Sequence, residues 1–182
     1  DPDTYRLVAL TTTRPAGASP VQDLAYTYDP IGNITEISDS AQPAVHFINA
    51  VVGASAHYTY DALYRLVMAD GREHIGQTTK PEIDWDDSPR MDHPHRNNGQ
   101  AMRRYTQAFT YDKAGNVATI THRRGDAPGG PIAWSRSFSV AAGSNRLLGS
   151  QVGTPGGRPP EAYEYDRDTN SRGNMTKLAP LA

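Results

Sequence analysis

The chain has 182 residues, a formal net charge of −2 and no cysteine, which excludes disulfides, thiolate metal sites and a cysteine nucleophile. A charge this close to zero gives no field that would favour nucleic acid or an anionic membrane. No run approaches the roughly 18 apolar residues that a membrane span needs. Leu, Ile, Val and Phe make up only 29 of the 182 residues, whereas tyrosine contributes 10. We therefore expect a thin sheet of stacked units without a thick central core.

Residues 1–10 have the turn and return strand of an incomplete hairpin unit, and residues 22–39 have the complete unit. Tyr26-Thr27-Tyr28 alternates as a strand does. Asp29-Pro30-Ile31-Gly32 suits a type I turn, because Asp bonds the turn backbone, Pro fixes φ and Gly accepts positive φ. The β-branched stretch at 34–37 then predicts a return strand. The unit is a β-hairpin closed by a glycine bulge.

The same unit recurs along the chain, so the chain is predicted to be a single repeat array with insertions. Further units are predicted at residues 57–70, 105–124, 134–152 and 161–178. Loops are predicted at residues 11–21, 76–104, 125–131 and 153–160. The positions that define the structural motif are Tyr26, Tyr28, Asp29, Gly32, Asn33, Tyr58, Tyr60, Asp61, Arg65, Phe109, Tyr111, Asp112, Gly115, Asn116, Tyr163, Tyr165, Asp166, Gly173 and Asn174.

Apolar residues on the predicted return strands lie three positions apart. The pairs are Leu7/Leu10, Ile34/Ile37, Leu66/Ala69, Val117/Ile120 and Met175/Leu178. On a regular strand this spacing puts the two side chains on opposite faces, whereas a β-bulge would return them to one face. The sequence is compatible with two covered faces and with a bulge.

These motifs resemble the YD repeats of the RHS family, whose signature is Tyr-x-Tyr-Asp-x-x-Gly-Asn or Tyr-Asp-x-x-x-Arg-Leu. Residues 61–66 and 71–77 further resemble RHS proteins of the insecticidal toxin-complex (Tc) type and related bacterial polymorphic toxins, and teneurins share the repeat more distantly. The resemblance implies an all-β fold of consecutive antiparallel hairpins in a curved or spiralling sheet, part of a larger shell. It further implies that the shell holds a C-terminal toxin domain.

We therefore expect a non-catalytic structural segment, secreted or at the bacterial cell surface. Its expected partners are the remaining repeats and the toxin domain of the parent polypeptide or complex. The chain starts without Met or a signal peptide and has too few units to enclose a cavity, so we expect it to be a piece of a longer one. The alternative is an exposed module that binds a carbohydrate or a host receptor through its tyrosines.

Two groups of side chains are candidates for a metal site or for catalysis, but no cofactor or metal is predicted. Asp92-His93-Pro94-His95 lies near the acidic stretch 84–87, but a proline separates the histidines and no second ligand motif accompanies them. The aspartates that recur once per unit are expected to cap turns, since a catalytic pair is needed only once. The histidines at positions 46, 57, 74 and 122 are expected to be ordinary strand or loop residues.

Overall fold

The computed structural model describes residues 1–15, 19–78, 95, 97–126, 129–153, 161–166 and 173–178, and nearly all of its regular structure is β-strand. The elements are β1 (Ala9–Thr12), β2 (Gln22–Tyr28), β3 (Ile34–Asp39), β4 (Val45–Phe47), β5 (Ala50–Val52), β6 (Ala56–Tyr60), β7 (Leu66–His74), the 3-10 helix η1 (Ile75–Thr78), β8 (Met102–Tyr111), β9 (Val117–Arg124), β10 (Ile132–Val140), β11 (Leu147–Val152), β12 (Glu161–Tyr165) and β13 (Met175–Leu178). The predicted all-β fold is confirmed.

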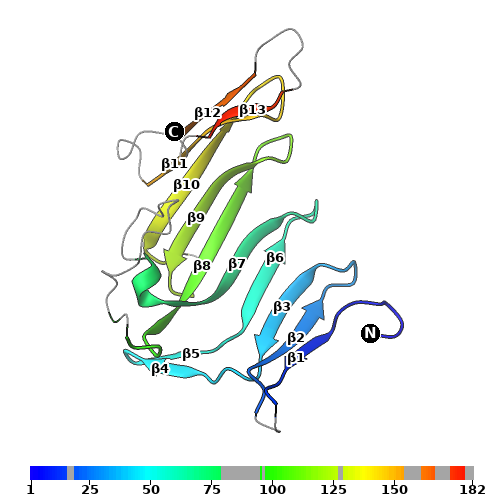
Figure 1. Cartoon of the computed structure of the whole chain (residues 1–182), viewed down its shortest axis with the longest axis vertical. Coiled ribbons are helices and arrows are strands. Elements are labelled where there is room, and N and C mark those ends of the chain that lie inside the picture. The colour runs from blue at the N-terminus through cyan, green and yellow to red at the C-terminus, as the bar shows by residue number, and fades with distance from the viewer. Residues whose placement is uncertain are drawn as a thin grey trace.

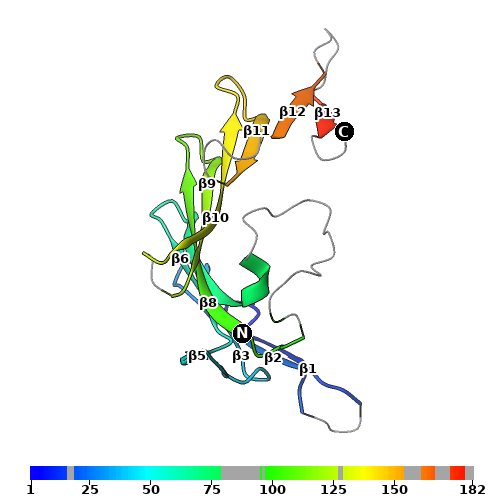
Figure 2. The same cartoon turned by 90° about the vertical axis from the view of Figure 1, so that its left-hand side faces the viewer.

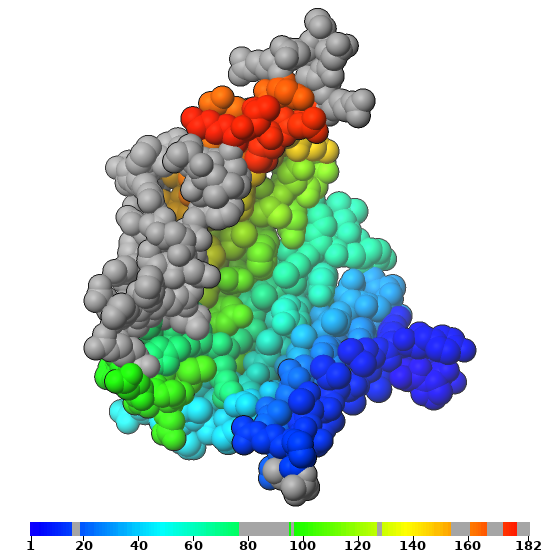
Figure 3. All heavy atoms as spheres, in the orientation of Figure 1, coloured from blue at the N-terminus to red at the C-terminus, as the bar shows by residue number. Residues whose placement is uncertain are grey.

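The strands form one 11-stranded sheet in the order β1-β2-β3-β6-β7-β8-β9-β10-β11-β12-β13, and β4 and β5 form a separate two-stranded sheet. Every pair of neighbours is antiparallel. Figure 1 shows the hairpin turns along one side of the sheet, which we call the turn end. We call β2, β6, β8, β10 and β12 outgoing strands, because they run toward the turn end, and the strands that leave it return strands. Figure 3 shows the strands as consecutive bands from one end of the molecule to the other.

The sheet is curved, and its two faces carry different side chains. Figure 2 shows η1 on the concave side. The ladder register keeps the tyrosines of the outgoing strands, together with Phe109 and Phe138, on the concave face. The alternate positions hold Thr27, Thr59 and Thr110, which are exposed. Because strand side chains alternate between faces, the aromatic residues share one side and the hydroxyl residues the other.

A β-bulge in each hairpin explains the three-residue spacing of apolar side chains. In the first complete hairpin, Tyr28 is paired with Ile34 and Tyr26 with Ile37, so one extra residue lies between the two pairs on β3. The same register shift occurs near the turn of the other hairpins. A bulge adds one residue to one strand and thereby returns positions three apart to the same face. Of the two explanations that the sequence left open, the bulge is the correct one.

The buried core is thin, as a single sheet layer requires. Among the described residues, the buried apolar side chains are Val52, Ala69, Ala101, Ala133 and Tyr163. The β4–β5 hairpin contributes the most completely buried large side chain, Val52, which is 1% exposed. None of the described helices has the length and hydropathy that crossing a membrane requires.

The strands of the sheet extend beyond several predicted boundaries. β7 continues to His74 and pairs there with Met102, so β8 begins inside the predicted loop 76–104. Likewise β1 continues through Thr12 in the predicted loop 11–21, and β10 begins at Ile132. The ends of β7 and β8 lack the alternating apolar pattern by which strands are predicted, because they carry charged residues: Arg72, Glu73, Arg103 and Arg104. The short strand β5 was not predicted.

Candidate functional site: hairpin turns and tyrosine clasps

In the motif hairpins other than β10–β11, which has Ala141 at this position, the turn is organised around one aspartate. In the first complete hairpin, Oδ1 of Asp29 accepts hydrogen bonds from the backbone N–H groups of Ile31, Gly32 and Asn33, at 3.1, 2.8 and 2.8 Å. Its other oxygen accepts a bond from the Asn33 side-chain amide at 2.8 Å. Gly32 has φ +110°, a left-handed value that an L side chain rarely adopts. The aspartate thus satisfies the backbone donors that the tight turn leaves unpaired.

The other turns repeat this arrangement with a variable donor. Oδ2 of Asp112 accepts a bond from the Asn116 amide at 2.9 Å. In the turn that has arginine in place of asparagine, Arg65 Nε donates to Oδ2 of Asp61 at 2.7 Å. Asn174 lies farther from Asp166, at 3.5 Å. Asparagine and arginine are therefore interchangeable as donors to the turn carboxylate.

These hydrogen bonds shift the acidity of the turn carboxylates. The side chain and backbone of Asn116 hold the pKa of Asp112 below its ordinary value of 3.8. The backbone N–H and guanidinium of Arg65 lower the pKa of Asp61 in the same way. Donors aimed at a carboxylate favour its charged form. The turns are consequently most stable when these aspartates are ionised.

A tyrosine hydroxyl joins each of four hairpins to the one before it. The last tyrosine of the outgoing strand donates to the backbone carbonyl of the first return-strand residue in the preceding hairpin or, in the case of Leu7, of the residue two positions before β1. We call this contact the tyrosine clasp. The clasps are Tyr28 to Leu7 at 2.7 Å, Tyr60 to Ile34 at 2.9 Å, Tyr111 to Leu66 at 2.7 Å and Tyr165 to Leu147 at 2.9 Å.

The clasps lie where the backbone ladder between hairpins has stopped. β3 pairs with β6 only at Glu36 with His57 and at Ile37 with Ala56, which leaves Ile34 near the turn without a ladder partner on β6. Bulges increase the local twist, so neighbouring strands separate toward the turns. The tyrosine side chain spans this gap and satisfies the carbonyl. Burial raises the pKa of Tyr60 above its ordinary value of 10.0, which keeps the donating proton on the hydroxyl.

Arginine at the last turn position adds a second contact to the next hairpin. The Arg65 guanidinium lies 4.6 Å from the ring centroid of Tyr111, and Arg6 and Arg146 lie 5.4 Å from the rings of Tyr28 and Tyr165. A cation over an aromatic face is attracted by the ring quadrupole, by about 0.5–1 kcal/mol at exposed sites. In these three junctions the clasping ring is therefore held from both its hydroxyl and its face.

One junction lacks the clasp. β10 has Val140 at the position that tyrosine occupies in the other outgoing strands, and Val140 is paired with Leu147 in its own hairpin. Valine has no hydroxyl to reach the Val117 carbonyl of the preceding hairpin. The two turns contact instead through Asn116 Nδ2, which lies 3.2 Å from Oδ1 of Asn145. The predicted unit at residues 134–152 is therefore the one whose junction with the preceding hairpin has no tyrosine.

A buried polar cluster on the concave face was not anticipated from the sequence. His122 is 4% exposed and its Nε2 lies 2.9 Å from Oε2 of Glu73, which is 6% exposed. The ring is stacked between Tyr105, at 5.0 Å, and Trp134, at 5.1 Å and an interplanar angle of 3°. Arg103 donates to the other Glu73 oxygen at 2.8 Å. Since Glu73 and His122 are far apart in the sequence, no local spacing could reveal their pairing.

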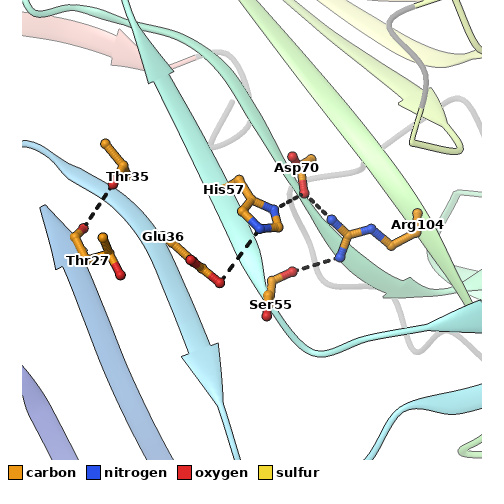
Figure 4. A network of polar contacts seen from close by, with 7 residues as sticks. All are labelled: Thr27, Thr35, Glu36, Ser55, His57, Asp70 and Arg104. Atoms are coloured by element: carbon orange, nitrogen blue, oxygen red, sulfur yellow. Dashed lines mark hydrogen bonds and ion pairs between the residues drawn. The ribbon is translucent and has the colours of Figure 1, made fainter. Parts of the chain in front are cut away.

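A second polar network crosses the convex face, and Figure 4 shows it from that side. Nε2 of His57 lies 3.8 Å from Glu36, and its Nδ1 lies 2.9 Å from Asp70. Asp70 also forms an ion pair with Arg104, which donates to the Ser55 carbonyl at 2.7 Å. The network therefore connects β3, β6, β7 and β8 through side chains on the face opposite to the tyrosines.

The structure brings the motif residues of each hairpin together at the turn end, but the first aromatic residue of each of the four clasping outgoing strands takes no part in the clasp. These residues are Tyr26, Tyr58, Phe109 and Tyr163. Tyr163 instead lies buried beside Ser150, with 3.2 Å between their hydroxyl oxygens. Most of the stretch weighed as a metal site lies outside the described residues. Within the described part of the chain, no three acidic or histidine side chains converge as metal ligands.

Comparison with known proteins gives similarities to Tc toxins. No protein-family model matches the chain. Two toxin subunits of Yersinia entomophaga are similar to it: YenC2 is 35% identical over 82% of the chain, and YenC1 is 33% identical over 99%. The chain spans only 15% and 19% of the length of these relatives. Solved structures of TcdB2-TccC3 and TcdB2-TccC3-Cdc42 match 81% of the chain with 34% identity and TM-scores of 0.58 and 0.57, and the chain covers 7% and 6% of those structures.

Tyr111→Phe should destabilise the chain by about 1 kcal/mol, because the Leu66 carbonyl loses its hydroxyl donor while the ring is kept. Urea denaturation followed by circular dichroism measures the change. Tyr26→Phe is the matched control, since the Tyr26 hydroxyl makes no clasp. Equal losses in both variants would contradict the assignment of the clasp.

Val140→Tyr should supply the missing clasp to Val117 and stabilise the chain by about 0.5–1.5 kcal/mol, the usual net value of one hydrogen bond. Val140→Phe adds the ring without the hydroxyl and should give less. The difference between the two midpoints of urea denaturation isolates the hydroxyl. A tyrosine variant no more stable than the phenylalanine variant would show that this junction is closed to a clasp.

Asp112→Asn should lower stability at pH 7, and the deficit should shrink as the pH falls below 3.8. The folded-state pKa of Asp112 is lowered, so its contribution is complete above the unfolded value and is lost as the pH falls through the folded value. Thermal melts at pH 7 and at a series of pH values below 3.8 test this. Asp126→Asn, at an exposed position outside the turns, is the control. A deficit that is independent of pH would exclude the ionised cap as its cause.

Proposed function

The chain is a segment of the RHS/YD-repeat type found in Tc toxin subunits, and from this premise we propose that it forms part of the wall of a shell around a toxin domain. As a toxin-complex component it would contact two partners: further repeats of the parent polypeptide or complex, and the enclosed toxin. A secreted or cell-surface location of the parent accompanies this proposal.

The observation that carries the proposal is the difference between the two faces of the curved sheet. The aromatic and aliphatic side chains of the hairpins gather on the concave face, whereas exposed threonine and serine occupy the convex face. All described strands except β4 and β5 belong to one sheet, so no second sheet of described strands covers the aromatic side. A concave face that carries the aromatic and aliphatic side chains, besides the polar cluster around His122, and a convex face of hydroxyl and charged groups suit a container whose content is a polypeptide.

The motif residues would then serve construction and not catalysis. Asp29, Asp61 and Asp112 accept hydrogen bonds with both carboxylate oxygens from backbone and side-chain donors within their own turns. Each clasping tyrosine spends its hydroxyl on a neighbouring backbone carbonyl. The same structural bonds recur from hairpin to hairpin, which supports a structural role without a cofactor.

The alternative, a carbohydrate- or receptor-binding module, has weaker support. The motif tyrosines are half-buried or buried, and none belongs to the exposed large apolar residues. A sugar platform requires an accessible ring face. In the clasped junctions, arginines lie over three of these faces. We therefore favour the shell wall over a glycan or receptor site.

Site-specific photo-crosslinking in the full-length polypeptide that contains this segment tests the proposal. A benzophenone amino acid at Phe109, on the concave face, should crosslink to the toxin domain of the parent, and mass spectrometry identifies the joined peptides. The same probe at the adjacent Thr110, on the convex face, is the matched control and should give no such product. Crosslinks to the toxin domain from Thr110 alone, or from neither position in the folded protein, would refute the enclosed arrangement.

A further inference from the structure

Asn98 and Gly99 form the only Asn-Gly pair of the chain, and they lie in the corner through which the chain enters β8. Asn98 begins a β-turn, because the Ala101 N–H donates to its backbone carbonyl at 3.0 Å. The N–H of Asn98 itself donates to the His95 carbonyl at 2.8 Å. Asn98, Gly99 and Gln100 are all exposed. The pair therefore combines a fixed backbone with access to water.

The carboxamide of Asn98 is turned toward the peptide that follows it. Its Oδ1 accepts a hydrogen bond from the N–H of Gln100 at 3.0 Å, which closes an Asx turn. The ring closed by this bond contains the Gly99 nitrogen, so Cγ of Asn98 and that nitrogen lie on the same side of the turn. The donor at Oδ1 also stabilises the negative charge that nucleophilic attack at Cγ would create on this oxygen.

The backbone nitrogen of Gly99 is free to attack this carboxamide. Its N–H donates no hydrogen bond to any of the residues that the structure describes. Gly99 also has no side chain, and a Cβ atom added to it would meet no atom within 4 Å. Neither a hydrogen bond nor steric crowding therefore opposes closure of a five-membered ring between Asn98 and Gly99.

We propose that Asn98 is a self-modification site, at which the chain converts this residue slowly into a mixture of aspartate and isoaspartate. The Gly99 nitrogen loses its proton to water or hydroxide and forms a bond to Cγ of Asn98. The Cγ–Nδ2 bond breaks, and Nδ2 takes up protons and leaves as ammonia. One water molecule then opens the resulting succinimide: cleavage at Cγ gives aspartate, and cleavage at the main-chain carbonyl carbon gives isoaspartate. The site is independent of whether the sheet encloses a toxin.

The asparagines of the hairpin turns are held in a different way. The carboxamide of Asn116 donates to Oδ2 of Asp112 at 2.9 Å and lies 3.2 Å from Oδ1 of Asn145, so it points back toward the turn aspartate. The next residue, Val117, is β-branched and is paired with Tyr111 in the ladder of β8 and β9. Ring closure at Asn116 would break both the turn cap and the start of this ladder. The fold thus protects this asparagine and leaves Asn98 reactive.

Conversion to isoaspartate should loosen the corner between β7 and β8. The product has one extra main-chain atom, and the former backbone carbonyl of Asn98 becomes a carboxylate outside the main chain. That carbonyl accepts the Ala101 N–H, and it lies 3.1 Å from Nε2 of His74. Ala101 is completely buried, and its own carbonyl accepts the Ile75 N–H at 2.9 Å. The change should therefore reach the end of the ladder, where His74 is paired with Met102.

Ageing of the full-length polypeptide that contains this segment tests the site. After incubation at neutral and at mildly alkaline pH, trypsin releases residues 97–103, and tandem mass spectrometry locates an exchange of NH2 for OH. We expect conversion at Asn98 and none at the adjacent Asn97. The rate should rise with pH, because the attacking nitrogen must lose a proton. An isoaspartyl methyltransferase then labels the isoaspartate in the product.

Gly99→Ala is the matched variant, since the added Cβ meets no neighbouring atom and the φ of Gly99 lies outside the left-handed region. It should slow the conversion of Asn98 about tenfold, a difference of about 1.4 kcal/mol in the barrier, because the Cβ hinders the approach of the nitrogen to Cγ. Equal rates in the two chains would overturn the proposed ring closure.

Val117→Gly tests whether the fold or the dipeptide alone decides the reactivity. It creates an Asn-Gly pair at Asn116 inside the turn cap, and circular dichroism establishes that the variant is folded. Asn116 should stay intact while Asn98 is converted. Ile34→Gly makes the same comparison at Asn33 if the first variant does not fold. Equal conversion of the asparagines in a folded variant would overturn the proposal, as would an Asn98 that reacts in urea and stays intact in the folded chain.

Hydrogen exchange measures the structural consequence. Anion exchange separates the converted chains by their added carboxylate, and the Ile75 amide should exchange faster in the fraction that contains isoaspartate. The unconverted fraction of the same sample is the control. An unchanged exchange rate of Ile75 would overturn the predicted loosening of the corner.

Discussion

The bond from a tyrosine hydroxyl to the carbonyl at the start of the preceding return strand is the interaction that joins neighbouring hairpins at the turn end in four of the five junctions. Each hairpin contains a bulge beside its turn, and the added twist ends the ladder between hairpins before the turns are reached. Without another donor, carbonyls such as that of Ile34 would face the gap unpaired. The tyrosine side chain is long enough to close the gap, as Tyr60 does with the Ile34 carbonyl.

In a single-layer sheet no second layer packs against the strands, so its stability must come from contacts between neighbouring strands and hairpins. The clasps and the stacked arginines supply these contacts at the turn end. Farther along the strands, ion pairs on the convex face connect β3 to β8, and the stacked His122 connects β7 to β10 on the concave face. Each contact contributes about 1 kcal/mol or less, and the array is held by their repetition.

The local chemistry of the fold could be predicted from the sequence, and the contacts between hairpins could not. Asp29 and Gly32 specify a turn through their own backbone preferences, so a short window suffices to find it. The spacing of Ile34 and Ile37 signalled a bulge, but only the pairing register distinguished it from a strand covered on both faces. The hydroxyl of Tyr111 reaches a carbonyl 45 residues earlier, and Glu73 meets His122 across 49 residues. Such partners are set by the curvature and register of the whole sheet, which no short motif encodes.

The bulge beside each turn has a further consequence for how such an array can change in evolution. Every motif hairpin has one extra residue beside its turn, and all of them except β10–β11 also have an aspartate cap. The register is therefore set again in each hairpin, and an alignment error does not pass to the next. The connections at the opposite side of the sheet are therefore free to vary in length: between β3 and β6 the chain accommodates the whole β4–β5 hairpin without disturbing the adjoining turns. That side of the sheet is where new sequence can be inserted, while the turn end keeps the architecture constant.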